Sequence, residues 1–243
     1  MLFAGVAASA LAAPVLEQYQ DYFPMIGLTV EETNLIRADP DDPVAWAIER
    51  ANRTEWLFRN AALQMGLYGV ILGAFLGLSE GLLVRSIWKA PLFSVALAAC
   101  GAVGGILAAL SAASLGTKMG DDITADPTQL TLAMHAAAFA IIGLALGLGS
   151  AVLTRKSSVI VRGAGGGLVA GLLFLPLAMF LVPTERTNLP VPEGLTSKFL
   201  FLILAGGLIG LCIGRTPRRA QRPHDVAADP TAEADTSGEP TNS

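Results

Sequence analysis

The chain has few of the side chains on which catalytic and metal sites depend. It contains two cysteines and two histidines among 243 residues. Cys100 and Cys212 both lie inside apolar runs, so neither a disulfide framework nor a Cys/His zinc site has support. The sequence also has no phosphate-binding loop, zinc-protease helix motif or nucleophile-elbow motif. We therefore expect no enzymatic activity, no cofactor and no metal.

Charge is also scarce, and this places the chain in a membrane. Only 15% of the residues are charged and 53% are hydrophobic, with a mean hydropathy of +0.56. These values lie outside the range typical of a soluble domain and favour a lipid bilayer as the surroundings. The formal charge of −4 comes mostly from acidic residues in the polar ends, so no nucleic-acid partner is expected.

Five apolar runs are long enough to cross a hydrocarbon core of about 30 Å as helices. Backbone polar groups must be satisfied inside a bilayer, which excludes isolated strands. The sequence therefore predicts an all-α membrane protein whose domain at 61–214 has five transmembrane helices. We place them at about 61–83, 91–115, 129–153, 159–182 and 196–214.

Three further segments flank this domain. Residues 1–16 are small and apolar with A-x-A-like triplets, so they resemble a signal peptide or a short signal anchor, although no basic residue precedes them. Residues 17–60 are polar, and a helix starting at Pro43 is expected to lie on the membrane as an amphipathic lead-in. Residues 215–243 are rich in Pro, Ala, Thr and acidic side chains, which predicts a disordered cytoplasmic tail.

The distribution of basic residues predicts the orientation. Nine basic residues lie on one side of the predicted helices and three on the other, in the short connections and the start of the tail. Cytoplasmic loops carry the excess, so residues 17–60 are expected outside the cytoplasm and the C-terminus inside, as in a bacterial inner membrane. The nine residues are Arg85, Lys89, Arg155, Lys156, Arg162, Arg215, Arg218, Arg219 and Arg222.

The first and third apolar runs resemble each other. Ile71–Arg85 and Ile141–Arg155 are identical at seven of fifteen positions, and Leu204–Arg215 is a shorter third copy. The even-numbered runs align as 101–110 with 163–172. Because the unit is a pair of helices, we expect an internal parallel repeat of a helical hairpin, with the fifth helix as a half unit.

Each copy contains a stripe of small residues spaced four apart. Such G-x-x-x-G stripes allow helix backbones to approach closely in lipid. We interpret them as helix-packing positions; the alternative is the lining of a pore or substrate path. The glycines are Gly73, Gly77, Gly81, Gly143, Gly147, Gly206, Gly210 and Gly214.

Ionisable residues inside membrane helices are the default functional candidates. Glu80 is the only carboxylate in the five apolar runs, and the second copy has Ser150 at its position. It is either a functional carboxylate or an interface anion paired with a cation such as Arg85. His135 is either proton-responsive or a hydrogen-bonded packing residue. Arg162 is expected to extend its side chain to the headgroups.

These features favour a non-enzymatic membrane scaffold or a subunit of a membrane assembly. The expected partners are the lipid bilayer and either further copies of the chain or other membrane subunits. The alternative is a small transporter or channel, because parallel repeats of helical hairpins also occur in transporters.

Overall fold

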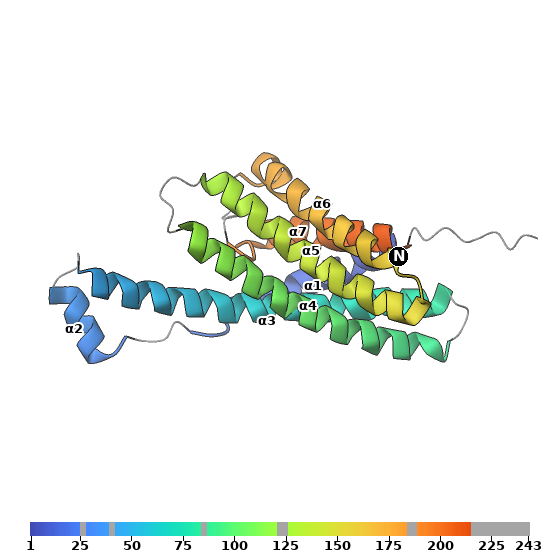
Figure 1. The fold of residues 1–243 in the computed structure, drawn as a ribbon, viewed down its shortest axis with the longest axis horizontal. Helices are drawn as coiled ribbons and strands as arrows, with labels where there is room; N and C mark the ends of the chain where they lie inside the picture. Colours follow the sequence, from blue (N-terminus) through green and yellow to red (C-terminus); the bar gives the residue numbers. More distant parts are fainter. Residues whose placement is uncertain (25–27, 39–41, 84–86, 121–125, 184–188, 215–243) are drawn as a thin grey trace, which may run out of the picture.

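The computed structural model describes residues 1–24, 28–38, 42–83, 87–120, 126–183 and 189–214. Within these residues the chain forms helices and no strand (Figure 1). The helices are α1 (Leu2–Gln18), α2 (Val30–Ala38), α3 (Pro43–Leu83), α4 (Lys89–Gly120), α5 (Pro127–Thr154), α6 (Ser158–Leu181) and α7 (Leu195–Gly214).

Five of these helices, α3 to α7, are long and apolar enough to cross a membrane, counted over the described part of the chain. This confirms the predicted all-α membrane protein with five membrane-spanning helices, whose exposed apolar side chains contact lipid. The predicted tail at 215–243 lies outside the described residues, as does Arg85.

Helix α3 differs from the prediction. The sequence suggested a helix lying on the membrane, followed by a separate spanning helix, but the structure joins them into one helix of 41 residues. Asp42 caps its start, since Oδ1 accepts from the Val44 amide at 2.9 Å. No proline interrupts the chain from Val44 to Leu83, so nothing forces the helix to end at the membrane surface. At 1.5 Å per residue α3 is about 60 Å long, roughly twice the hydrocarbon thickness.

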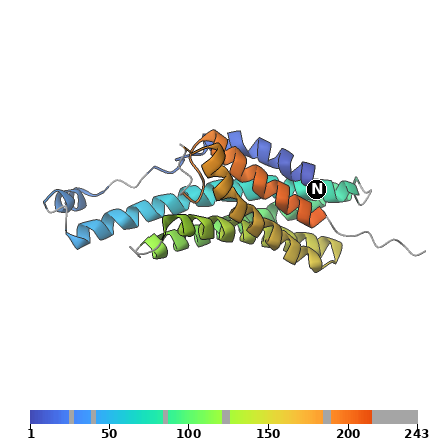
Figure 2. The same ribbon diagram turned by 90° about the horizontal axis from the view of Figure 1, so that it is seen from above.

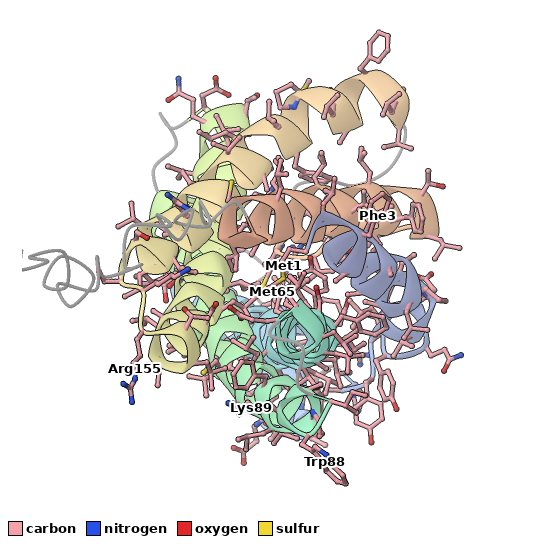
Figure 3. All side chains as sticks on the ribbon, turned by 90° about the vertical axis from the view of Figure 1, so that its right-hand side faces the viewer. Met1, Phe3, Met65, Trp88, Lys89 and Arg155 are labelled. Carbon is pink, nitrogen blue, oxygen red and sulfur yellow. The ribbon has the colours of Figure 1, made fainter. Side chains whose placement is uncertain are left out.

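The six helices other than α2 form a closed ring. Each packs against the next in the order α3, α4, α5, α6, α7 and α1, and α1 packs back against α3. Figure 3 looks along this bundle, with α1 beside α7 and α3. We call the end where α3 begins the arm end, and the end at Leu83, Thr154 and Gly214 the tail end.

Large apolar side chains fill the middle of the ring. The two on α3 are four residues apart, and each directly precedes a glycine of the stripe. The others come from α5 and α7. All are buried, so the interior at mid-depth is closed by side chains in this structure. They are Leu72, Leu76, Phe139, Ile142, Leu146, Phe201 and Ile209.

Helix α1, the segment predicted to be a signal peptide or signal anchor, lies along α7 (Figure 2). It buries one stripe of mostly small residues against α7 and α3 and exposes Phe3 and Leu11 on its other side. The buried residues are Gly5, Ala8, Ser9, Ala12, Ala13 and Leu16.

Candidate functional site: polar groups at the two ends of the bundle

All eight glycines of the predicted packing stripes lie at contacts between helices. A Cβ atom built on any of them would come within 2.9 Å of an atom in the adjacent helix or, for Gly210 and Gly214, of Met1, which precedes α1. Real Cβ contacts are essentially never under 3.0 Å, so a side chain at any of these positions would force neighbouring atoms to shift. The neighbours are Leu97, Phe93 and Ala90 for Gly73, Gly77 and Gly81; Gly163 and Val159 for Gly143 and Gly147; Gly5 and Ser9 for Gly206; and Met1 for Gly210 and Gly214.

Glu80 lies at the tail end, near the last turn of α3, and only 8% of its surface is exposed. Its partner is Ser150 on α5, whose hydroxyl oxygen lies 2.8 Å from Oε2 and 3.0 Å from Oε1. The Lys156 ammonium, just beyond α5, also interacts with the carboxylate electrostatically. The carboxylate therefore links α3 to α5, and its hydrogen-bond donor occupies the matching position of the second sequence copy. Pairing with Arg85 stays a prediction, because that residue lies outside the described part.

His135 is fully buried in α5 toward the arm end. Its Nε2 lies 3.0 Å from the carbonyl oxygen of Leu189, and its ring meets Phe174 and Phe201 edge-on, with centroids 5.0 and 5.2 Å apart. A carbonyl only accepts, so Nε2 carries the hydrogen. Nδ1 has no hydrogen-bond partner among the described residues. The ring is therefore held by one hydrogen bond and two aromatic contacts, as the packing alternative expects.

Arg162 lies in the second turn of α6 at the tail end and is half-buried. It interacts with the residues around it. Its position near a helix end is compatible with the predicted reach toward the headgroups.

The sequence did not reveal an ionic cluster at the arm end. Lys198, in the first turn of α7, has only 1% of its side chain exposed. Its ammonium donates to Glu17 Oε2 at 2.6 Å and to Gln20 Oε1 at 2.5 Å. Glu17 lies in the last turn of α1, and Gln20 follows the end of that helix. In the sequence, Lys198 is one of the three basic residues on the less basic side of the predicted helices. No feature of the sequence predicts that it pairs with a residue 181 positions away.

A small cavity of about 40 Å³ adjoins this cluster, lined in part by Gln20, Gln64, Asn60 and Lys198. A cavity needs about 10–15 Å³ to hold one water molecule, so this cavity has room for a few. Gln64 is buried, and its Oε1 has no hydrogen-bond partner within the described ranges.

A third polar group ties α1 to α7 and α3 at mid-depth. The Tyr68 hydroxyl donates to the carbonyl oxygen of Leu202 at 2.9 Å. Ser9 Oγ lies 2.7 Å from the same oxygen and 2.8 Å from Gly5 O. A serine hydroxyl has one hydrogen, so it donates to one of these carbonyls at a time.

Comparison with known proteins found no matching family model, no matching curated protein and no matching solved structure. Within the described residues, no group of three or more His, Cys, Asp or Glu side chains is placed to hold a metal ion. The features from which a functional proposal can be argued are the Glu80–Ser150 pair, the Lys198 cluster and the arm formed by α2 and the start of α3.

Proposed function

We propose that this polytopic membrane protein is a non-enzymatic scaffold or assembly subunit, and that it binds a partner through its arm. The arm is α2 together with residues 43–59 of α3. The observation that supports this role is the continuity of α3. One unbroken helix runs from the closed ring into a part that projects beyond the other helices (Figure 1). Such a helix holds a docking surface at a fixed position relative to the membrane.

The arm has its own local order. Helix α2 begins with a reciprocal capping box, in which the Thr29 amide donates to Glu32 Oε2 at 2.7 Å and the Glu32 amide donates to Thr29 Oγ1 at 3.2 Å. Helix α2 packs on α3, where Ala45 is buried. Trp46 and Val44 are each 56% exposed on the same stretch. An exposed tryptophan on a rigid helix is typical of a contact residue in an interface.

The arm itself carries a groove of about 570 Å³, which residues 47–58 of α3 line together with residues 110–114 of α4. Most of its lining residues are small or apolar, and two are charged, which suits a single helix with a small-residue face. We propose that this groove takes one helix of a membrane partner. The lining includes Ala47, Ala51, Glu55, Phe58 and Leu110.

Photo-crosslinking in cells tests this role. A photoreactive amino acid at Ala51, which is exposed in the groove, should give one protein adduct of defined mass. The same probe at Val103, 58% exposed on the membrane-spanning part of α4, should react with lipid alone. Ala47→Trp fills the groove and should abolish the Ala51 adduct. Equal adducts from the two positions, or a protein adduct that persists in Ala47→Trp, would refute the docking role.

Transport is the second candidate, supported by one face of α3. Buried side chains four residues apart read Gln64, Tyr68, Leu72, Leu76 and Glu80. Gln64 and Glu80 therefore lie toward the two ends of the interior, and Leu72 and Leu76 close it between them, as in a path closed at mid-depth.

Flux measurements in liposomes separate the two candidates. Glu80→Gln keeps the shape of the side chain and removes its charge. If the protein is a scaffold, the wild-type protein carries no ion flux. If it is a transporter, wild type carries flux that the folded Glu80→Gln variant loses.

A further inference from the structure

We propose that α1 is not removed from the mature protein but stays as a sixth membrane-embedded helix that closes the ring between α7 and α3. The residues that resemble a signal-peptide cleavage region are then packing residues. This inference is independent of the proposed docking role.

The small side chains of α1 have a structural reason. Ala8, Ala12 and Ala13 have no exposed surface, and they share the face that contacts α7 and α3. At the closest approach, a Cβ built on Gly5 would lie 1.9 Å from Gly206 O. Small residues three and four apart on a helix face are what close packing in lipid requires. Ala8 and Ala12 belong to the A-x-A triplets at 8–10 and 10–12, which share the exposed Ala10. Packing therefore explains two of the three alanines in this pattern.

Two polar ties hold α1 in the ring. Ser9 is fully buried at mid-helix and lies within hydrogen-bond distance of the Leu202 carbonyl on α7. At the arm end, Glu17 gives the buried Lys198 ammonium its carboxylate partner. Cleavage just after Ala12 or Ala13 would keep Glu17 in the chain, but it would remove the helical turns that hold Glu17 beside the Lys198 ammonium. A buried cation without a fixed counter-ion is unfavourable in a low-dielectric site.

The contacts between α1 and α7 follow the same antiparallel register as the two complete hairpins. In α5 and α6, Gly143 meets Gly163 and Phe139 meets Gly167, four residues away on each helix. In α7 and α1, Gly206 meets Gly5 and Leu202 meets Ser9, again four residues apart. Helix α1 therefore occupies the position of a second hairpin helix, and α7 is not left as the half unit that the sequence suggested.

The first hairpin supports the same register and corrects one detail of the sequence alignment. Gly73, which the alignment matches with Gly143, meets Leu97, and Gly69 meets Gly101. By its contacts, Gly163 in the second hairpin therefore corresponds to Leu97 in the first. Leu97 lies one turn before Gly101, the residue that the sequence alignment matches with Gly163. The sequence alignment pairs glycine with glycine, whereas the contacts pair residues that lie opposite each other on the two helices of a hairpin.

The orientation of α1 is consistent with this assignment. Helix α1 runs antiparallel to α7, with Met1 against Gly210 at the tail end. Its 17 residues span about 25 Å at 1.5 Å per residue, close to the hydrocarbon thickness of about 30 Å. If the tail end faces the cytoplasm, as the basic residues predict, α1 begins inside and delivers residues 17–60 outside.

The direct test is the N-terminus of the mature protein. The chain is expressed with its own start and a C-terminal tag, purified from membranes, and analysed by intact mass and N-terminal peptide sequencing. We expect peptides from residues 2–18 in stoichiometric amount. A mature chain that begins just after Ala12 or Ala13 would overturn the proposal.

A matched pair of substitutions tests whether the retained helix is part of the fold. Ala8→Leu places a large side chain in the buried stripe, whereas Ala7→Leu makes the same change at the preceding residue, which is exposed. We expect Ala8→Leu to lower the melting temperature in detergent by several degrees and Ala7→Leu to leave it unchanged. Equal melting temperatures would show that α1 does not pack in the ring.

A charge exchange gives a readout that remains informative if Ala8→Leu fails to fold. Lys198→Glu alone should destabilise the protein, and Glu17→Lys added to it should recover part of the loss, because the pair is restored with reversed sign. Failure of the second change to recover any stability would contradict the contact between α1 and α7.

Discussion

The tight helix contacts lead to a prediction that two glycines two residues apart on α6 respond in opposite directions to the same substitution. A Cβ at Gly163 would lie 2.2 Å from Gly143 O, whereas a Cβ at Gly165 has no atom within 4 Å. Both are interior helix positions, so both changes to alanine bring the same gain in helix propensity, about 1 kcal/mol. The difference between the variants therefore isolates the contact.

The size of the difference follows from the geometry. An ordinary Cβ contact begins at 3.4 Å, so α5 and α6 must separate by about 1 Å to accept Gly163→Ala. Overpacking of this kind costs about 1–3 kcal/mol. Gly165→Ala has no such cost. For a chain of this size one kcal/mol shifts the melting temperature by about 2–4 °C, so the two variants should melt roughly 2–12 °C apart.

Thermal unfolding in one detergent, followed by intrinsic fluorescence, measures this difference. Gly163→Ala should melt below Gly165→Ala, and Gly165→Ala should melt at or above wild type. If the two variants melt at the same temperature, the α5–α6 backbones are not in contact at Gly163, and the interpretation of the glycine stripes is wrong.

Two further predictions concern polar groups. Ser150→Ala removes the hydroxyl donor of Glu80 and should cost about 1–3 kcal/mol, more than the control Ser94→Ala, whose hydroxyl bonds only a helix carbonyl. Equal losses in detergent melting would contradict this. The Thr29 amide and hydroxyl hold the pKa of Glu32 below its usual value of 4.5, so the capping box stabilises α2 above that pH and is lost as pH falls through the lower value in the folded state. An NMR titration of the Glu32 carboxyl with a midpoint at or above 4.5 would contradict it.

Much of the fold could be predicted because hydropathy alone determines which segments enter lipid. The five long apolar helices follow from run length, and the start of α2 follows from the Thr29/Glu32 spacing. The length of α3 could not be predicted in the same way, because hydropathy marks only its apolar half. A polar helix that continues in the same direction and one that turns onto the membrane have the same composition.

The candidate sites were predictable only in part. Glu80 is conspicuous as a carboxylate in an apolar run, and the repeat even places Ser150 at the matching position. Whether Glu80 and Ser150 contact each other depends on how α3 and α5 pack beside α4, which a single sequence does not determine. Lys198 and Glu17 are separated by almost the whole chain, and each looks like an ordinary polar residue at the edge of an apolar segment.

The closed ring, with α1 seated against α7, is the central claim, and a disulfide cross-link tests it most directly. A Cβ built on Gly207 lies 3.6 Å from Val6 Cγ2, and a cysteine sulfur occupies a similar place, so Val6→Cys with Gly207→Cys suits a disulfide. Both native cysteines are first replaced by alanine, and the control pair is Leu11→Cys with Gly207→Cys, since Leu11 is 52% exposed and lies more than a helical turn beyond Val6. After mild oxidation in native membranes, mass spectrometry of non-reduced peptides should find the linked pair for Val6 and not for Leu11. Absence of the Val6 link, or equal linking of both pairs, would contradict the closed ring.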